Sequence, residues 1–219
     1  GDSNGLGEID LGTLKLTTVG EILKLFGRSG DLPLDGQFRG GIVFSGALRK
    51  PQTMKARANL TEMELRPKAD KGQIGAQVVE DLTLRNNGPV IIEMDDRGFQ
   101  IVQAQLLGKE TNLTASGTIA TSARNAWNVS FKGALNLGIF QNAISGLRTS
   151  GLAEVNAVVR GTIEEPQLGG RAEVKNANLT HRDLPNSIDR LNGIVVFDRN
   201  RALLQSFTAQ TGGGELKLG

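Results

Sequence analysis

Apolar and polar residues alternate along most of this chain with a period of two. In the segment 54–61, Met54, Ala56, Ala58 and Leu60 share one face of an extended strand, and Lys, Arg, Asn and Thr residues share the other. The same alternation recurs over residues 38–48, 113–119, 129–137, 155–163 and 171–175. Because successive side chains of a strand point to opposite sides, the pattern predicts antiparallel strands with one apolar and one solvated face.

Turn-forming residues separate the predicted strands. Clusters rich in Asn, Asp, Gly or Pro mark the turns at 49–51, 86–88, 95–98, 164–166 and 212–214. Only two segments, 18–27 and 139–147, show the three- and four-residue spacing of an amphipathic helix. We interpret both as short helices that cap the sheet rather than as membrane-surface anchors, because they have little polar face.

The chain contains an internal repeat. The pattern Gly-x9-Gly-x4-Pro begins at Gly36 and returns 115 residues later at Gly151. Further along, the segment 87–92 matches 192–197 at a spacing of 105. The glycines, the prolines and the alternating apolar positions of the two segments all match, which indicates that two related units follow one another.

The first unit is predicted over 1–130 and a second, incomplete unit over 131–219, each a short helix followed by a strand meander. Two arrangements are open: two tandem β-sandwiches, or one sheet that is extended strand by strand. We favour the continuous sheet, because no Pro- or Ser-rich linker separates the units.

Composition then limits how the apolar face can be covered. The 219 residues include 29 Gly, and aromatic residues make up only 4%. An apolar sheet face in water has to be covered, and two short helices are too few to cover a sheet of this length. The face must therefore meet another sheet, or bend on itself and enclose something. Glycines at strand positions, such as Gly40, Gly117 and Gly133, favour bending.

The sequence argues against an enzyme. Cys is absent and His181 is the single histidine, so thiolate and multi-histidine metal sites and a histidine-based triad are hard to build. Asp95 and Asp96 are followed by Arg97-Gly98 between two strands, which predicts a hairpin turn rather than a pair of catalytic or metal-binding carboxylates. We expect no catalytic residue, no cofactor and no metal. The 25 basic and 23 acidic residues are evenly mixed, so no nucleic-acid footprint is expected.

One segment carries a family resemblance. Residues 182–198 read Arg-Asp-Leu-Pro-Asn-Ser-Ile-Asp-Arg-Leu-Asn-Gly-Ile-Val-Val-Phe-Asp, followed by Leu203, Phe207 and the glycines at 212–214. This segment, together with the Gly-x9-Gly-x4-Pro pattern, resembles the TamB and AsmA-like family. The resemblance covers most of the chain and is strongest from about residue 135 onward. The chain begins and ends abruptly in its pattern, so we expect it to be a piece of a longer protein.

The resemblance implies an all-β fold in which an elongated antiparallel sheet is folded into a U-shaped trough, the β-taco, with one or two short helices. It implies a periplasmic location, as part of a full-length protein that is anchored in the bacterial inner membrane. A TamA-like outer-membrane partner would be met through parts of the full-length protein that are absent here.

The expected function is to carry phospholipid acyl chains between the inner and outer membranes along an apolar groove, which would support outer-membrane biogenesis. The alternative is a scaffold or chaperone for outer-membrane protein assembly and secretion that pairs strands with nascent β-barrel proteins. The residues expected to line the groove are Phe38, Ile42, Phe44, Leu48, Leu60, Ile92, Leu113, Ile119, Val129, Phe131, Leu135, Val155, Val159, Ile163, Val174, Phe207 and Leu216.

Overall fold

The computed structural model describes residues 4–18, 34–47, 53–67, 82–120, 127–140, 146–162 and 165–218. These residues form one antiparallel sheet of 13 strands, which confirms the all-β prediction. The strands are β1 (Asn4–Lys15), β2 (Leu34–Ala47), β3 (Lys55–Pro67), β4 (Leu84–Asn86), β5 (Val90–Asp95), β6 (Gly98–Gly108), β7 (Thr111–Ala120), β8 (Trp127–Asn136), β9 (Arg148–Gly161), β10 (Pro166–Thr180), β11 (Ile188–Arg199), β12 (Arg201–Thr211) and β13 (Gly214–Leu218).

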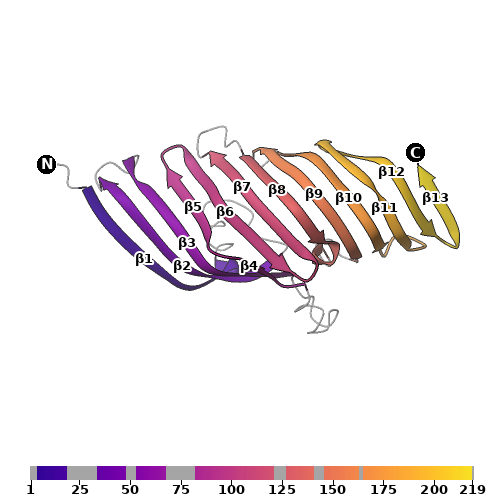
Figure 1. Ribbon diagram of the computed structural model, residues 1–219, viewed down its shortest axis with the longest axis horizontal. Coiled ribbons are helices and arrows are strands. Elements are labelled where there is room, and N and C mark those ends of the chain that lie inside the picture. The colour runs from indigo at the N-terminus through magenta and orange to yellow at the C-terminus, as the bar shows by residue number, and fades with distance from the viewer. Residues whose placement is uncertain are drawn as a thin grey trace.

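Apart from β4 and β5, each strand lies beside the next one in the sequence, so the sheet is a meander from β1 to β13. Strands β4 and β5 share one position in the sheet, because both lie between β3 and β6. Figure 1 shows the strands side by side along the long axis, with β1 and β13 at opposite ends. The described residues therefore form one continuous sheet and not two tandem sandwiches.

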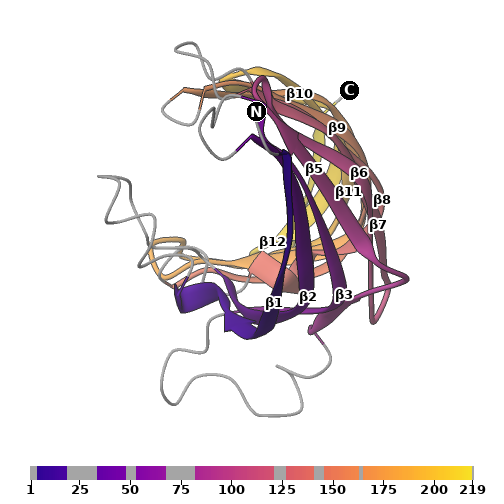
Figure 2. The same ribbon diagram turned by 90° about the vertical axis from the view of Figure 1, so that its left-hand side faces the viewer.

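The sheet is curved into a trough. Viewed from the β1 end, the strands bend so that their two ends turn toward the same side, and the sheet is open along that side (Figure 2). This C-shaped section agrees with the predicted U-shaped trough. No second sheet of described residues packs against it.

The described residues include only small parts of the two predicted helices. Of the segment 18–27, only residue 18 is described, at the end of a helical stretch over 16–18. In the segment 139–147, the described helix is a 3-10 turn, η2 (Leu137–Phe140), and Gly146 and Leu147 are already non-helical. Residues 19–27 and 141–145 lie outside the described residues.

The sequence repeat is visible in the strand registers. Strand β1 pairs with β2 as β8 pairs with β9: Ile9 lies opposite Ile42, and Phe131 lies opposite Ala157, 115 residues after Ile42. Six successive sheet positions, from β1 to β7, thus have counterparts from β8 to β13.

In the hairpins the repeat spacing is 103 residues rather than 105. The β5–β6 hairpin pairs Asp95 with Gly98, and the β11–β12 hairpin pairs Asp198 with Arg201. The strand ladders keep the spacing of 105 that the sequence predicts: Ile92 lies opposite Ala58, and Phe197 lies opposite Gly170, the counterpart of Ala58. The difference of two in the hairpins keeps every side chain on the same face, so the predicted apolar face is unaffected.

Glycines allow the bend at places where neighbouring strands come too close for a side chain. Gly117 in β7 has φ of +142°, and a Cβ atom there would overlap the backbone oxygen of Asn128 in β8. Gly170 in β10 has φ of +111°, and a Cβ atom would overlap the backbone oxygen of Asn156 in β9. Only glycine adopts such a backbone without strain.

Asparagine side chains close the gaps that β-bulges leave in the ladder. The register between β2 and β3 shifts after Arg39, and the Met63 N–H donates to Asn86 Oδ1 at 2.7 Å. In the second unit the register shifts after Lys175, and the Asn176 N–H donates to Asn192 Oδ1 at 2.8 Å. Both units thus have a bulge in corresponding strands, β3 and β10, where it contributes to the curvature.

Replacing Gly117 with Ala is expected to destabilise the chain by on the order of 2 kcal/mol, because the added methyl group would overlap the β8 backbone at a positive φ. The matched control is Gly41→Ala, whose Cβ would meet its nearest atom, the Ile9 oxygen, at an ordinary 3.5 Å. Urea denaturation followed by circular dichroism measures both changes. Equal stability losses in the two variants would contradict this role of Gly117.

Candidate functional site: the apolar concave face

Cross-strand pairing assigns every strand residue to one of two faces. Phe131 in β8 lies opposite Ala115 in β7 and Ala157 in β9, and Ala157 lies opposite Gly170 in β10. Gly170 in turn lies opposite Phe197 in β11. Paired residues share a face, so an unbroken apolar row crosses five strands. We call the side that carries this row the apolar face, and the other side the polar face.

Of the seventeen residues predicted to line a groove, fifteen are described, and the registers put all fifteen on the apolar face. Leu48 and Ile163 lie outside the described residues. The fifteen are Phe38, Ile42, Phe44, Leu60, Ile92, Leu113, Ile119, Val129, Phe131, Leu135, Val155, Val159, Val174, Phe207 and Leu216.

The apolar face is the concave side of the trough. Ala153 and Ala209 are only 2% exposed and Val129 only 3%, although no second layer of described strands covers them. Their chain neighbours on the polar face, Glu154 and Thr208 among them, are exposed. In a single sheet, side chains become this buried on the inside of a bend, where neighbouring side chains converge over them. The curvature seen in Figure 2 supplies that bend.

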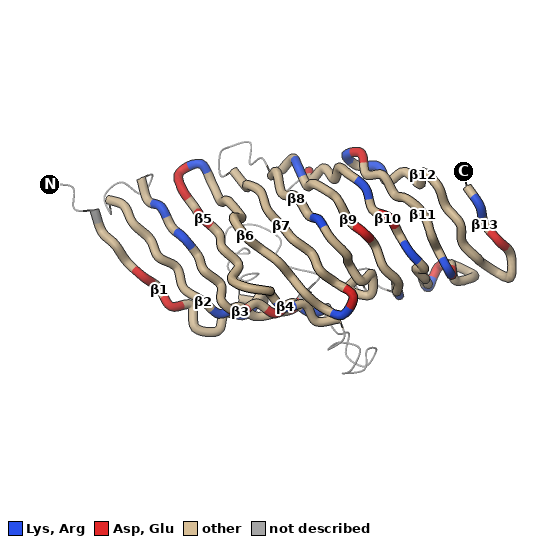
Figure 3. The backbone as a smooth tube through the Cα atoms, viewed as in Figure 1, with Lys and Arg blue, Asp and Glu red and all other residues tan. Residues whose placement is uncertain are grey.

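Charged side chains are kept off the apolar face in the central strands. Figure 3 shows charged residues on most strands of the sheet. In β7 to β10, however, the registers place every described charged residue on the polar face: Lys132, Arg148, Glu154, Arg160, Arg171, Glu173 and Lys175. The centre of the concave face is therefore uncharged.

The few hydroxyl groups on the concave face of these central strands already have partners. Thr111 is 4% exposed, and its Oγ1 accepts a hydrogen bond from the Asn136 N–H at 2.9 Å. Thr149 Oγ1 donates to the Leu137 carbonyl at 2.7 Å. In the described part of the chain, no buried side-chain nitrogen or oxygen is without a hydrogen bond. The face thus offers a ligand contact and exclusion of water, with little hydrogen bonding.

A small core of buried apolar side chains lies at one end of the strands, near the middle of the length of the trough. Leu82, Leu84 and Ile139 are 6–7% exposed, and Leu82 packs against Gly138 of η2, where a Cβ atom would lie 2.8 Å from Leu82 Cδ2. The helix η2 of the second unit therefore packs on the first unit and joins the two.

The sequence analysis missed this local core and the smallest residues of the lining. Ala153, Ala157 and Ala172 are among the most buried residues of the concave face, yet only larger side chains were proposed. They follow the same two-residue period as Val155 and Val174, and that shared period was the signal that could have identified them. The residues around Leu82 carry no such periodic signal.

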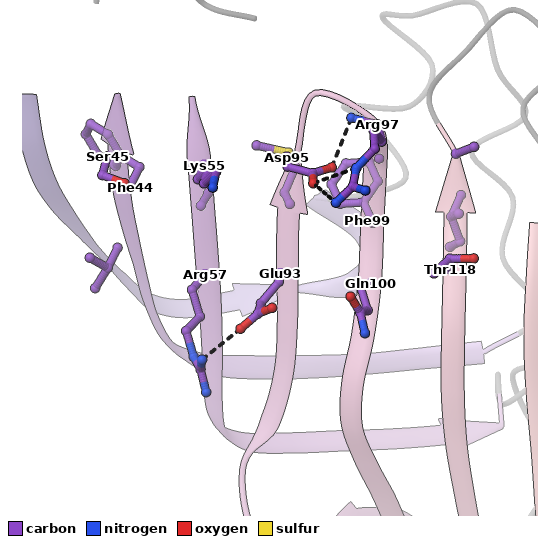
Figure 4. A pocket seen from close by; sticks show the side chains of 16 residues that line it. Phe44, Ser45, Lys55, Arg57, Glu93, Asp95, Arg97, Phe99, Gln100 and Thr118 are labelled. Atoms are coloured by element: carbon purple, nitrogen blue, oxygen red, sulfur yellow. Dashed lines mark hydrogen bonds and ion pairs between the residues drawn. The ribbon is translucent and has the colours of Figure 1, made fainter. Parts of the chain in front are cut away.

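A described pocket of about 720 Å³ is lined by residues of both faces of the sheet. Its lining includes the polar-face residues Arg57, Glu93 and Gln100 and the apolar-face residues Phe44, Phe99 and Ile119, from strands β2, β3, β5, β6 and β7. In Figure 4, Arg57 Nη1 points to Glu93 Oε1 at 2.8 Å, and Arg97 folds back on Asp95 at 2.6 Å. Hydrogen bonds from Arg97 lower the pKa of Asp95. These opposite charges are satisfied within the protein.

Asp95 and Asp96 form the hairpin that the sequence predicts. Asp95 ends β5 opposite Gly98, and Asp96 and Arg97 are the turn residues. His181 lies after β10, with Nδ1 3.7 Å from Asp183 Oδ2. Among the described residues, no group of three or more His, Asp or Glu side chains is arranged to hold a metal ion. Within the same residues, no helix is long and apolar enough to cross a membrane.

Comparison of the chain with known families, curated proteins and solved structures finds no match.

A charge on the concave face is expected to weaken binding of an environment-sensitive fluorescent fatty acid. Val159 lies on the apolar face opposite Val129 and Leu168, whereas its neighbour Val158 lies on the polar face opposite Ser130. We predict that Val159→Asp raises the Kd of the probe roughly tenfold or more, because a carboxylate resists burial beside an acyl chain. Val158→Asp, on the same strand, is the matched control and is expected to leave the Kd unchanged. Equal Kd changes in the two variants would rule out binding on this face.

Proposed function

We propose that this chain carries phospholipid acyl chains along its concave apolar face, as part of an envelope protein that moves lipid between the inner and outer bacterial membranes. The observation that supports this is an apolar concave face that runs the full length of a 13-stranded sheet and is covered by no second layer of described strands. The uncharged centre of this face suits hydrocarbon and does not suit a phosphate or sugar group.

The length of the trough favours a conduit over a single binding site. Twelve successive strand positions at about 4.8 Å each give a groove of roughly 50 Å. Transfer of a 16-carbon chain from water into such a lining is worth roughly 12 kcal/mol before losses, at about 0.8 kcal/mol for each CH₂ group. Because the lining is similar along its length, this energy changes little as a lipid slides, and the barriers to movement stay small.

The location and partners follow from the sequence resemblance and are part of the same proposal. The chain would stand in the periplasm within a full-length protein anchored in the inner membrane, and a TamA-like partner would be met through other parts of that protein. The reaction is passive transfer, so no catalytic residue, cofactor or metal is required.

A second candidate is a scaffold for outer-membrane protein assembly. Among the described strands, β1 pairs only with β2 and β13 pairs only with β12, so these two strands have one unpaired edge within the described sheet. A free edge can accept a nascent β-strand by main-chain hydrogen bonding. The two candidates differ in which surface is occupied: the concave face by lipid, or the edges by protein.

Site-specific photo-crosslinking in cells distinguishes these candidates. A photoreactive residue at Phe131, on the concave face, is expected to give lipid adducts, and one at the adjacent Lys132, on the polar face, is expected to give none. Mass spectrometry of the purified protein identifies the adducts. Lipid adducts at both positions, or protein adducts confined to β1 and β13, would count against the conduit.

The same contrast is expected in the physiology of the cell. Val159→Asp in the full-length protein is expected to abolish its support of outer-membrane integrity, because a charge interrupts the apolar path, whereas Val158→Asp is expected to preserve it. Sensitivity to vancomycin and detergent measures the effect, and circular dichroism of the purified chain shows whether each variant is folded. Full activity of a folded Val159→Asp protein would exclude lipid conduction through this section.

A further inference from the structure

The pocket drawn in Figure 4 lies at one rim of the trough, close to where five strands begin or end. Three consecutive residues of each strand line it, together with the turn residue Arg97: residues 43–45 of β2, 55–57 of β3, 93–95 of β5, 98–100 of β6 and 118–120 of β7. In each triplet the middle residue lies on the apolar face and its two neighbours lie on the polar face. A ligand in this rim pocket can therefore contact both kinds of surface at once.

The apolar part of the rim pocket continues into the concave face. The five middle residues pair across the strands in one row, namely Phe44, Ala56, Met94, Phe99 and Ile119. The next row of the apolar face lies two residues further along each strand and contains Ile42, Ala58, Ile92, Ile101 and Gly117. Hydrocarbon on the concave face can thus extend into the rim pocket without crossing a polar row.

The polar part of the rim pocket leaves one positive charge without a counter-ion. Arg57 Nη1 lies 2.8 Å from Glu93 Oε1. Arg97 Nη2 lies 2.6 Å from Asp95 Oδ2, so both acidic residues of the lining already have a basic partner. Lys55 is exposed and forms no ion pair with any residue that the structure describes, and no dashed line reaches it in Figure 4.

An ammonium group beside an apolar row suits the phosphodiester of a phospholipid. Phosphate oxygens are strong acceptors, and lysine binds them as a compact positive charge. Ser45 lies directly opposite Lys55 across the ladder, and its hydroxyl makes no hydrogen bond to another described residue. This hydroxyl can donate to the same phosphate group. A neutral glyceride would leave the Lys55 ammonium without a partner.

We propose that the rim pocket binds the phosphodiester of a phospholipid through Lys55, while an acyl chain of the same molecule enters the concave face over Ile42 and Ile92. The proposal rests on the lipid-carrying function proposed above, and it adds which group of the lipid is held and where. Zwitterionic and anionic phospholipids share the phosphodiester. The rim pocket therefore selects phospholipids as a class over neutral glycerides.

The internal repeat indicates a substitution of Lys55 that the fold accepts. Ser45 pairs with Lys55, and Arg160, 115 residues after Ser45, pairs with Gln167. Gln167 is thus the counterpart of Lys55 in the second unit, so the sheet does not need a charge at this position. Lys55→Gln removes the ammonium, and Lys55→Arg keeps a positive charge. Lys132→Gln is the matched control, because Lys132 is an exposed lysine of the polar face outside the rim pocket.

Isothermal titration calorimetry with three ligands, each below its critical micelle concentration, tests the rim pocket. Lysophosphatidylglycerol has a phosphodiester and one acyl chain, a monoacylglycerol with the same chain lacks the phosphodiester, and glycerophosphoglycerol lacks the chain. We expect the unmodified protein to bind lysophosphatidylglycerol about fivefold more tightly than the monoacylglycerol, through one charge-assisted contact at an exposed site. Lys55→Gln is expected to abolish this preference by weakening lysophosphatidylglycerol binding alone. Lys55→Arg and Lys132→Gln are expected to keep it.

Three results would overturn the proposal. A folded Lys55→Gln protein, as judged by circular dichroism, that keeps the fivefold preference would exclude Lys55 as the phosphate ligand and leave the acyl-chain conduit intact. Glycerophosphoglycerol binding as tight as that of lysophosphatidylglycerol would make the rim pocket a site for free phosphodiesters rather than for lipid. Failure of both acyl ligands to bind the unmodified protein would overturn the proposed function itself, and this inference with it.

Discussion

The need to shield one apolar face from water shapes this molecule. Thirteen strands each place apolar side chains on the same side of one sheet, and no second sheet among the described residues covers them. Bending brings the side chains of that face together, and Ala153, Ala209 and Val129 are only 2–3% exposed. The groove that remains is lined by hydrocarbon and open along one side, and a hydrocarbon ligand would complete the shielding.

The curvature is produced by local features in both units. Glycines stand where β7 and β10 approach their neighbours too closely for a side chain, and asparagine side chains accept hydrogen bonds at the bulges of β3 and β10. On the polar face, ion pairs such as Arg57–Glu93 and Arg39–Glu62 link neighbouring strands of the first unit. These exposed pairs add little stability individually, and they keep the polar face solvated while the apolar face turns inward.

Most of the correct predictions came from the two-residue alternation of apolar and polar side chains. It identified β2, β3 and β7 to β10, and the registers put predicted lining residues as distant as Phe38 and Leu216 on one face, because a strand allows only two directions for a side chain. The repeat spacing is 105 residues in these strands and 103 in the hairpins, and the difference of two changes no face. The period could not reveal the core around Leu82 or the contact of η2 with the first unit, since both depend on how segments distant in the sequence come together. Nor could it show that small residues such as Ala153 would be the most buried, because their burial comes from the bend.

Native mass spectrometry of the chain after incubation with phospholipid vesicles tests lipid binding by the concave face most directly. If the face holds acyl chains, the protein should retain whole phospholipid molecules, with similar occupancy for zwitterionic and anionic headgroups, because the uncharged centre of the groove contacts only the tails. A chain that stays lipid-free, under conditions in which a known lipid carrier keeps its ligand, would contradict the account.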